Sequence, residues 1–284
     1  MVKMSKLSEH TLLINLFIAL TKKDSKFKSY LHDIGFEVEA IEPQWTSGTL
    51  EYNPDLFILN NSDSHLLIVE CKSGGLDRKQ TEKYANISKD DIIRANIVRR
   101  TFNNTDFCFA CLNTNLNKLQ TDLQRYQLSF TIIVKDNDKI ITQGTFNHGS
   151  LKSLFSQVLD IPADVPTHYF PFGLNDSDAF TMSGLSQSLI QRCSLGQDFI
   201  IEELIADSNE YFNHNYIQPQ IRQNFIGKVN RILSNLREVE LIDFLTRVGN
   251  KWHFTSKNNS AFTKKLQIGI ERLDAQRNQS RLNL

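Results

Sequence analysis

Two short apolar runs on either side of a polar turn constrain the fold of this chain more than any other feature. Residues 56–59 read Leu-Phe-Ile-Leu, and residues 65–69 read His-Leu-Leu-Ile-Val. The stretch between them, Asn-Asn-Ser-Asp-Ser, consists of residues that favour turns. Two runs of this length around such a turn predict a β-hairpin.

Charged residues stand at the outer ends of this predicted hairpin. Asp55 precedes the first run, and Glu70-Cys71-Lys72 ends the second. Side chains alternate between the two faces of a strand, so Glu70 and Lys72 share one face and Cys71 points to the other. Antiparallel pairing should bring Asp55 close to Glu70, so that two acids and an amine meet at one end of a sheet.

These residue types suit a metal site beside a phosphate. Mg²⁺ prefers oxygen ligands and is usually held by one or two carboxylates together with water and substrate phosphate. A bound metal lowers the pKa of its water and neutralises charge on a phosphoryl oxygen. A nearby lysine can stabilise the negative charge that develops during the reaction.

Pro54-Asp55 followed by Glu70-Cys71-Lys72 resembles the motif of the PD-(D/E)XK nuclease superfamily. The resemblance covers roughly the first half of the chain and implies Asp55, Glu70 and Lys72 as catalytic residues. It also implies a Mg²⁺ or Mn²⁺ ion held by Asp55, Glu70 and the main-chain carbonyl of Cys71. The alternative is a strand edge with solvated charges, because Pro, Asp, Glu and Lys all blunt sheet edges.

Accessory residues follow from the same resemblance. Gln80 and Tyr84 lie four residues apart on one face of the next predicted helix, where several such nucleases carry a Gln-X-X-X-Tyr-like feature. A surface glutamine and a packing tyrosine are the alternative. Glu9 is the candidate acid on the first helix, although a carboxylate there also suits a helix N-terminus. Glu37 and Glu39 are further candidates, and the choice stays open.

The order of apolar patterns predicts an α/β fold with a restriction-endonuclease-like αβββαβ core, a mixed central sheet and an extra hairpin. The expected elements are a buried helix over 11–33 interrupted near 22–24, a strand over 36–41, the hairpin, a helix over 77–100, a strand over 106–112, a helix over 116–126 and strands over 128–134 and 140–145. The proline-rich texture after Asp160 predicts a nuclease-like domain over 1–160, a linker over 161–180 and a second, mainly α domain over 181–284.

The second domain resembles a winged helix, a common DNA-binding module. Residues 199–205 and 209–213 predict two helices, Pro219 begins a third, and 241–254 predicts a two-stranded wing around Gly249-Asn250. The segment from Gln220 to Arg237 holds four basic residues and no acid. The DNA-binding candidates are Arg222, Gln223, Asn224, Lys228, Arg231 and Lys251. A solvated helix face or a protein-contact module is the alternative.

Composition excludes some classes of protein. Equal numbers of basic and acidic residues, 32 each, argue against a surface that is basic throughout. The four cysteines suggest no disulfide framework, and Cys108 and Cys111, three apart on a predicted strand, would face opposite ways. No apolar run is long enough to cross a bilayer. We expect a cytoplasmic protein without a membrane partner.

The sequence therefore predicts a Mg²⁺-dependent DNA endonuclease of restriction, phage defence or a mobile element, and a homodimer would serve double-strand cutting. One alternative is a nuclease subunit that works with an ATPase or transposase partner, since the layout is loosely similar to transposon-end nucleases of the TnsA kind. Those often carry Gln at the position of Glu70. Another alternative is an inactive DNA- or protein-binding module on a nuclease fold. No phosphate-binding loop is present in the sequence.

Overall fold

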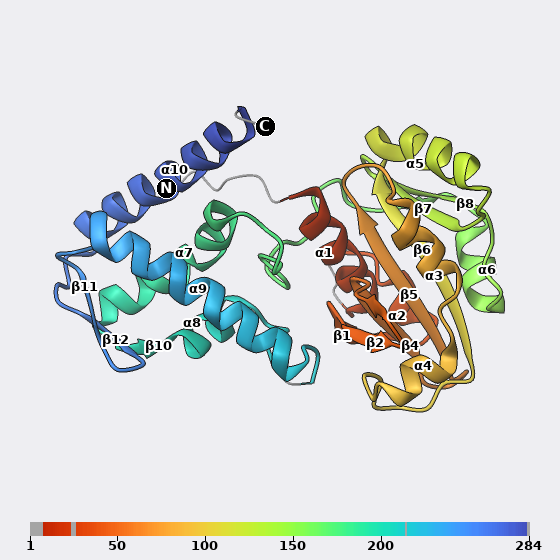
Figure 1. Ribbon diagram of the computed structural model, residues 1–284, viewed down its shortest axis with the longest axis horizontal. Helices are drawn as coiled ribbons and strands as arrows, with labels where there is room; N and C mark the ends of the chain where they lie inside the picture. Colours follow the sequence, from red (N-terminus) through yellow and green to blue (C-terminus); the bar gives the residue numbers. More distant parts are fainter. Residues whose placement is uncertain (1–7, 24–26, 214, 283–284) are drawn as a thin grey trace. The chain divides into compact units, whose positions relative to one another are not determined.

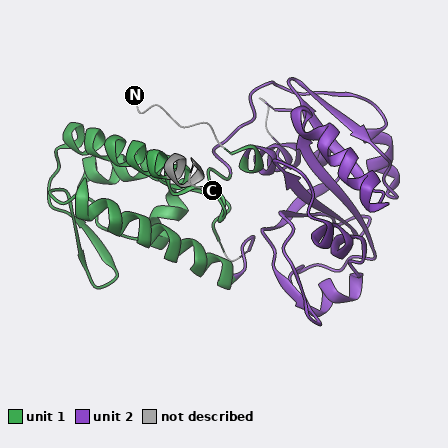
Figure 2. Cartoon of the chain, turned by 45° about the horizontal axis from the view of Figure 1, so that its top comes forward, with its two compact units in different colours: residues 1–11, 170–213, 219–284 green, residues 12–169, 214–218 purple. Residues whose placement is uncertain are grey.

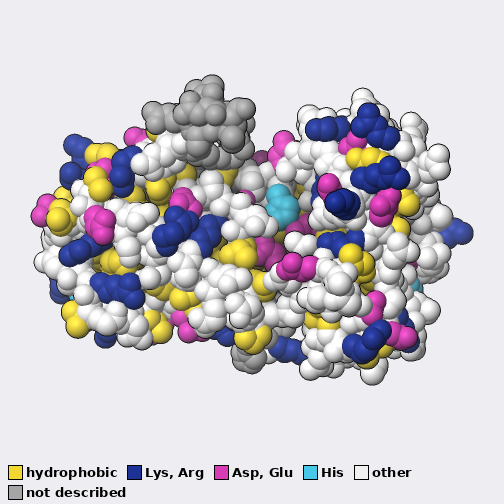
Figure 3. Space-filling model, viewed as in Figure 1, with side chains coloured by type: hydrophobic (Ala, Val, Ile, Leu, Met, Phe, Trp, Pro, Cys, Tyr) yellow, Lys and Arg dark blue, Asp and Glu magenta, His cyan; other side chains and the backbone are white. Residues whose placement is uncertain are grey.

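The computed structural model describes residues 8–23, 27–213 and 215–282. The chain divides into two compact units (Figure 2). Unit 1 comprises residues 1–11, 170–213 and 219–284, and unit 2 comprises residues 12–169 and 214–218. The face seen in Figure 3 carries Lys and Arg side chains alongside Asp and Glu side chains rather than a field of one sign.

Unit 2 is built around a seven-stranded sheet. Its elements are most of α1 (Glu9–Thr21), α2 (Tyr30–Asp33), β1 (Phe36–Ile41), β2 (Trp45–Ser47), β3 (Leu50–Tyr52), β4 (Leu56–Asn60), β5 (His65–Lys72), α3 (Arg78–Ala85), α4 (Lys89–Arg94), β6 (Asn104–Leu112), α5 (Asn113–Tyr126), β7 (Thr131–Asp136), β8 (Lys139–Gln143), α6 (Gly149–Phe155) and β9 (Leu159–Asp160). The strand order in the sheet is β1-β4-β5-β6-β7-β8-β9.

The sheet is mixed, as predicted. Strands β1, β4 and β5 pair antiparallel, β5, β6 and β7 pair parallel, and β8 and β9 return antiparallel. The chain is thus an α/β protein with a mixed, curled seven-stranded sheet followed by a helical C-terminal region. The predicted hairpin is confirmed: Leu56 pairs with Val69, and Asn60 pairs with His65 beside the turn. Every residue of β4 is buried, as expected for a strand in the interior of the sheet.

Helices α3, α4 and α5 cover the face of the sheet that carries Leu66 and Ile68 (Figure 1). Tyr84, Ile92 and Leu119 from these helices join that apolar cluster. Glu70 and Lys72 share the face of Leu66 and Ile68 by strand alternation. The sheet face that bears the predicted site is therefore covered by the helices that follow it in sequence.

The cysteine interpretation is also supported. All four cysteines are free and buried. Cys111 belongs to the cluster under α3 to α5, whereas Cys108, three residues earlier on β6, does not. Burial raises the pKa of the Cys111 thiol to about 12. Neither position has the character of a reactive or metal-bound thiolate.

One local prediction for unit 2 was wrong, and four short elements were not predicted. The helix expected over 77–100 is broken into α3 and α4, because Ser88 accepts a hydrogen bond from the Asp91 amide and caps a new helix. The hairpin β2–β3 was not predicted; it pairs Trp45 with Tyr52, and their rings stack with centroids 4.9 Å apart. Strand β9 and helix α6, only seven residues long, were also missed.

The apolar run at the start of the chain forms α1, interrupted after Thr21 as predicted. Its residues from Leu13 to Leu20 are completely buried. Figure 1 shows this helix beside the sheet. Among the described residues, no helix has both the length and the apolar character that crossing a membrane requires.

Unit 1 contains the C-terminal elements. They are α7 (Asp178–Leu195), β10 (Phe199–Ile200), α8 (Ile201–Ser208), α9 (Pro219–Val239), β11 (Leu245–Val248), β12 (Lys251–Phe254) and α10 (Asn259–Leu282). The three strands form a small antiparallel sheet in the order β10-β12-β11.

Helix α9 begins at Pro219, as predicted, and buries the whole predicted apolar stripe. The stripe consists of Ile221, Phe225, Val229, Ile232, Leu233 and Leu236. The wing turn at Gly249 is confirmed, with φ 63° at that glycine, a left-handed conformation that favours glycine.

Other predictions for the C-terminal region were wrong. Residues 209–213 form turns rather than a helix. The helix predicted over 199–205 is confirmed from Ile201 onward as α8, whereas residues 199–200 pair with β12 as a strand. Helix α7 was missed although Ser177 caps its start and Gly196, with φ 63°, ends it. Helix α10 was missed as well, and β11 begins at Leu245 rather than at 241.

Candidate active site

The carboxylate of Asp55 is fixed beside the end of β5. The amide of Cys71 donates a hydrogen bond to Asp55 Oδ2 at 2.6 Å. The amide of Asp55 donates in turn to the carbonyl of Val69 at 3.1 Å. The hydrogen-bond ladder between β4 and β5 thus continues one residue beyond β4. The register of the hairpin therefore brings Asp55 to the end of β5, as predicted from the sequence.

Glu70 and Lys72 meet on one face of β5, as strand alternation requires. Lys72 Nζ donates to Glu70 Oε1 at 2.7 Å, and both side chains are largely buried. Lys72 Nζ also donates to Gln80 Oε1 at 2.8 Å. The ammonium therefore bridges the end of β5 to the first turns of α3.

Gln80 and Tyr84, the two accessory candidates on α3, both contact Glu70. Gln80 Nε2 donates to Glu70 Oε1 at 3.1 Å, and the Tyr84 hydroxyl donates to Glu70 Oε2 at 3.0 Å. Gln80 Nε2 also lies 3.1 Å from the Tyr84 hydroxyl. A spacing of four residues on one helical turn places both groups over the same carboxylate.

Burial dominates the electrostatics of this cluster. Asp55 is 7% exposed and Glu70 is 4% exposed. Burial, and after it the charge of Asp55, raises the pKa of Glu70 to about 7, although Lys72 and the hydrogen bond from Tyr84 oppose the rise. Burial and the charge of Glu70 raise the pKa of Tyr84 well above its ordinary value, so its hydroxyl stays a donor.

A short segment after β5 holds α3 in place over the site. Asp122 on α5 accepts a hydrogen bond from the Leu76 amide at 2.8 Å, and the Tyr126 hydroxyl donates to the Leu76 carbonyl at 2.9 Å. At Gly75 a Cβ atom would lie 2.6 Å from Lys118 Cε and 2.8 Å from the Asp122 carboxylate, so a larger residue there would displace these side chains. Asp77 then caps α3 by accepting from the Gln80 amide at 2.8 Å. These positioning residues carry no motif, and sequence reasoning missed Asp122 and Tyr126.

The donor set fits one hard divalent cation better than a zinc ion. Asp55 and Glu70 are buried carboxylates whose negative charges repel each other, and a cation between them would remove this repulsion. Mg²⁺ needs only one or two protein carboxylates, because water and phosphate complete its shell. Within the described residues there is no group of three or more His, Cys, Asp and Glu side chains placed to hold a metal ion. The carbonyl of Cys71 as a third ligand stays a prediction.

The other candidate acids have different surroundings. Glu39 on β1 accepts from the Arg99 amide at 2.8 Å, and Glu37 pairs with Arg100 at 3.4 Å. Both therefore anchor the segment before β6. Glu9 is the first residue of α1 and belongs to unit 1, whereas the site belongs to unit 2. Its role as an accessory ligand stays a prediction.

A groove of 400 Å³ adjoins the site on the side of Gln80. Residues 49–51 at the β2–β3 hairpin form one wall, and α3 forms the other. Lys79 and Lys83 of α3 line this groove together with Gln80. The Lys83 ammonium also lies 5.4 Å from the centroid of the Tyr52 ring. Glu51 and Asp77 line the same groove, so its charge is mixed.

The predicted DNA-binding cations of unit 1 all have partners within that unit. Arg222 pairs with Glu202, and Arg231 makes two hydrogen bonds, of 2.9 and 2.8 Å, to Asp178. Lys228 donates to the carbonyls of Gly173, Leu174 and Asp176. Lys251 lies 3.8 Å from Asp198. Gln223 and Asn224 are exposed on α9. The DNA-binding role of these residues stays a prediction.

Comparison with known proteins identifies a family and a relative. The model of the MJECL32 domain matches residues 9–170. The uncharacterized protein MJECL32 of Methanocaldococcus jannaschii is 30% identical over 95 residues, which cover 29% of this chain and 22% of that protein. The chain thus spans less than a quarter of the length of this curated relative. No solved structure matches the chain significantly, and no nuclease family is identified.

Proposed function

This chain belongs to the family of the MJECL32 domain, and we propose that the domain is here a Mg²⁺-dependent DNA endonuclease. The observation that carries the proposal is the convergence of Asp55, Glu70 and Lys72 at the end of β5. Lys72 and Gln80 contact the same oxygen of Glu70, which ties α3 into the cluster. This arrangement supports the resemblance to PD-(D/E)XK nucleases, with unit 2 as a restriction-endonuclease-like domain.

The residues of the cluster divide the chemistry between them. Asp55 and Glu70 would hold a Mg²⁺ or Mn²⁺ ion, which when bound neutralises phosphoryl charge and lowers the pKa of a coordinated water. Lys72 would orient the attacking water or stabilise the charge on the leaving oxygen. Gln80 and Tyr84 keep the Glu70 carboxylate in one orientation. Each donates one hydrogen bond to it, and Gln80 donates a third bond to the Tyr84 hydroxyl. The adjoining groove would carry the DNA backbone past Lys79 and Lys83.

A plasmid assay tests this function. Purified protein is incubated with supercoiled plasmid in Mg²⁺, in Mn²⁺ and in EDTA, and the nicked and linear products are measured. We expect cleavage with either metal and none in EDTA. Cleavage of equal rate in EDTA would contradict a metal-dependent mechanism. Absence of cleavage with either metal would favour the inactive-module alternative, unless an added ATPase or transposase partner restores it, as in a TnsA-like subunit.

Unit 1 is proposed to position the DNA as a winged helix. Its order of α7, β10, α8, α9 and the β11–β12 hairpin supports this assignment, with α9 as the recognition helix, and α10 follows the hairpin. Because Arg222, Lys228 and Arg231 hold other parts of unit 1, their replacement would perturb the fold as well as the interface. Exposed residues on α9 and the wing are better probes.

Lys251 at the wing and the Gln223–Asn224 pair on α9 should affect DNA binding differently. Lys251→Gln should lower the slope of log K against log salt by about 0.9, because one phosphate contact is lost. The double variant Gln223→Ala, Asn224→Ala should lower the affinity for preferred DNA sequences, since side-chain amides read base edges. The slope of log K against log salt should stay unchanged, because no phosphate contact is lost. Fluorescence anisotropy over a salt series measures both. Lys265→Gln, on the exposed face of α10, is the matched control. Unchanged affinity and slope in both Lys251→Gln and the double variant would refute the assignment.

A further inference from the structure

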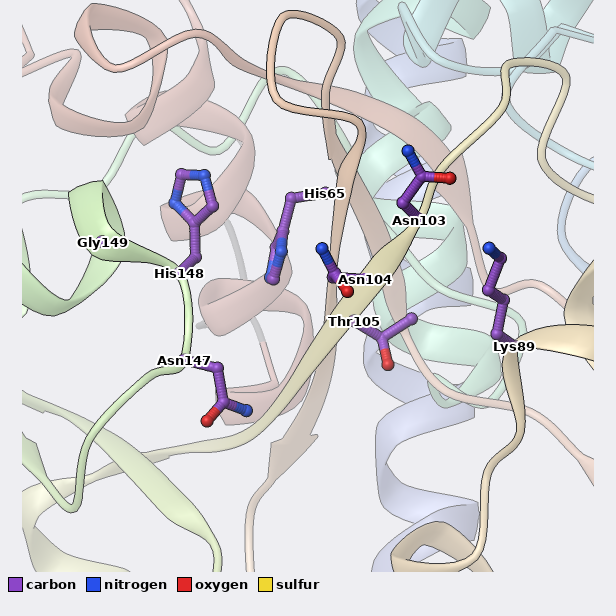
Figure 4. A pocket seen from close by; sticks show the side chains of 8 residues that line it. All are labelled: His65, Lys89, Asn103, Asn104, Thr105, Asn147, His148 and Gly149. Carbon is purple, nitrogen blue, oxygen red and sulfur yellow. The ribbon is translucent and has the colours of Figure 1, made fainter.

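A polar pocket of 620 Å³ lies at the end of β5 opposite Glu70 (Figure 4). Its walls are the starts of β5 and β6, the start of α4 and the turn before α6. The lining includes His65, Lys89, Asn103, Asn104, Thr105 and His148. Five residues separate His65 from Glu70, which places them about 17 Å apart along the strand and on opposite faces of the sheet. The pocket is therefore separate from the candidate active site.

The lining of this pocket is rich in hydrogen-bond donors. None of the eight described residues that line it is acidic. Within the described part of the chain, the side chains of Lys89, Asn103, Asn104 and Thr105 have no hydrogen-bond or ion-pair partner. An ammonium, two amides and a hydroxyl thus line one open pocket, in which the solvent-exposed side chains of Asn103 and Asn104 are available to a ligand.

The two carboxylates that contact the histidines of the pocket accept hydrogen bonds from within the protein. Asp106 accepts hydrogen bonds from His65 Nε2 at 3.0 Å, from the amide and side chain of Asn147 at 2.9 and 3.0 Å, and from the His148 amide at 3.0 Å. Although burial opposes it, these bonds hold the pKa of Asp106 below its ordinary value. His148 Nε2 donates to Asp63 at 3.0 Å. Each of the two imidazoles in the lining therefore already has a carboxylate partner.

We propose that this pocket binds a nucleoside monophosphate. Lys89 supplies the single full positive charge in the lining and would neutralise the phosphate. Asn103 and Asn104 each offer a donor and an acceptor, as recognition of a nucleobase edge requires. The imidazoles of His65 and His148, whose centroids are 4.5 Å apart, are fixed by Asp106 and Asp63 and form a rigid wall.

The size of the cavity favours a nucleotide over a bare anion. Pockets for small organic ligands span about 300–1,000 Å³, and this cavity falls in the middle of that range. Inorganic phosphate would fill a small part of it and would leave the amides of Asn103 and Asn104 to water. A nucleoside without phosphate would leave the ammonium of Lys89 unpaired.

Calorimetric titration of the full chain in EDTA tests the proposal without metal at the active site. The probes are AMP, GMP, CMP and UMP, the four nucleosides, inorganic phosphate and a single-stranded oligonucleotide. We expect at least one monophosphate to bind with a Kd below about 100 μM, and its nucleoside and inorganic phosphate to bind at least about tenfold more weakly. Binding of the oligonucleotide alone, or of no probe, would overturn the proposal.

Variants locate the binding. Lys89→Met and Asn104→Ala should each lower the affinity for the monophosphate about tenfold, because each removes one charge-assisted or bidentate contact. Lys139→Met, at an exposed lysine of β8, and Glu70→Gln should leave the affinity unchanged. Equal binding by Lys89→Met and wild type would place the ligand elsewhere. Loss of binding in Glu70→Gln would assign it to the active site.

Discussion

Replacement of Lys72 by alanine is expected to lower the rate of Mg²⁺-dependent DNA cleavage by about 10²- to 10³-fold, the usual effect of removing one preorganised charge from an active site. Lys72 is the ammonium within reach of Glu70, and Gln80 holds it there. The measurement is the single-turnover rate of plasmid nicking. It is made over a range of pH, because Lys72 lowers the pKa of Glu70 and its removal should raise that pKa above the wild-type value of about 7.

The comparison needs two controls. Lys139→Ala removes an exposed lysine from β8 of the same sheet and should cleave at the wild-type rate. Thermal unfolding of Lys72→Ala shows whether the cluster still folds, because the variant leaves a buried carboxylate without its ammonium. Equal cleavage by a folded Lys72→Ala and the wild type would remove Lys72 from the mechanism.

Glu70→Gln should greatly weaken metal binding, and in the metal-free protein its stability relative to wild type should rise with pH. The amide keeps the shape of the side chain but removes the charge that a divalent cation needs. Mn²⁺ titration followed by electron paramagnetic resonance should show at least about a hundredfold loss of affinity, equivalent to about 3 kcal/mol. Equal Mn²⁺ affinity in the variant and the wild type would exclude Glu70 as a ligand.

The stability effect follows from the raised pKa of Glu70. A folded-state pKa of about 7, above the ordinary value of 4.5, means that Glu70 adds stability fully below pH 4.5 and that this stability is lost as the pH rises through 7. Glutamine does not titrate. The stability of Glu70→Gln relative to wild type should therefore increase between pH 4.5 and about 8, by up to about 3 kcal/mol.

Urea unfolding in EDTA across this pH range measures the difference. Glu82→Gln on α3 removes an exposed acid that pairs with Arg78, and it should change stability by no more than about 0.5 kcal/mol. A stability difference between Glu70→Gln and wild type that stays constant with pH, or falls as the pH rises, would contradict the electrostatic account of the cluster.

The three central site residues were predicted from the register and face alternation of a β-hairpin, and the structure brings them together for the same reason. The hairpin, its turn and the alternation of faces follow from period-two patterns, and these place Asp55, Glu70 and Lys72 at one end of the sheet. Gln80 and Tyr84 follow from the four-residue spacing of a helix. Strong local periodicity therefore fixed the parts of the fold that carry the site.

Contacts between residues distant in sequence had no such signal. Asp122 clamps the segment before α3, and Arg231 pairs with Asp178 fifty-three residues away; neither contact has a local pattern. The break between α3 and α4 depends on Ser88 as a cap within an otherwise helical stretch. The His65–Asp106 pair does have a weak signal in the sequence, because both polar residues lie near the starts of adjacent apolar strands. Only the parallel register of β5 and β6 shows that they meet.

The central claim is that Asp55 and Glu70 share a divalent cation. A crystal of the protein soaked in Mn²⁺ and measured at the manganese absorption edge tests it most directly. The account predicts an anomalous peak between the two carboxylates, about 2.2 Å from an oxygen of each, and no peak there in Glu70→Gln crystals. Full manganese occupancy elsewhere in the wild-type crystal, with none between Asp55 and Glu70, would contradict it.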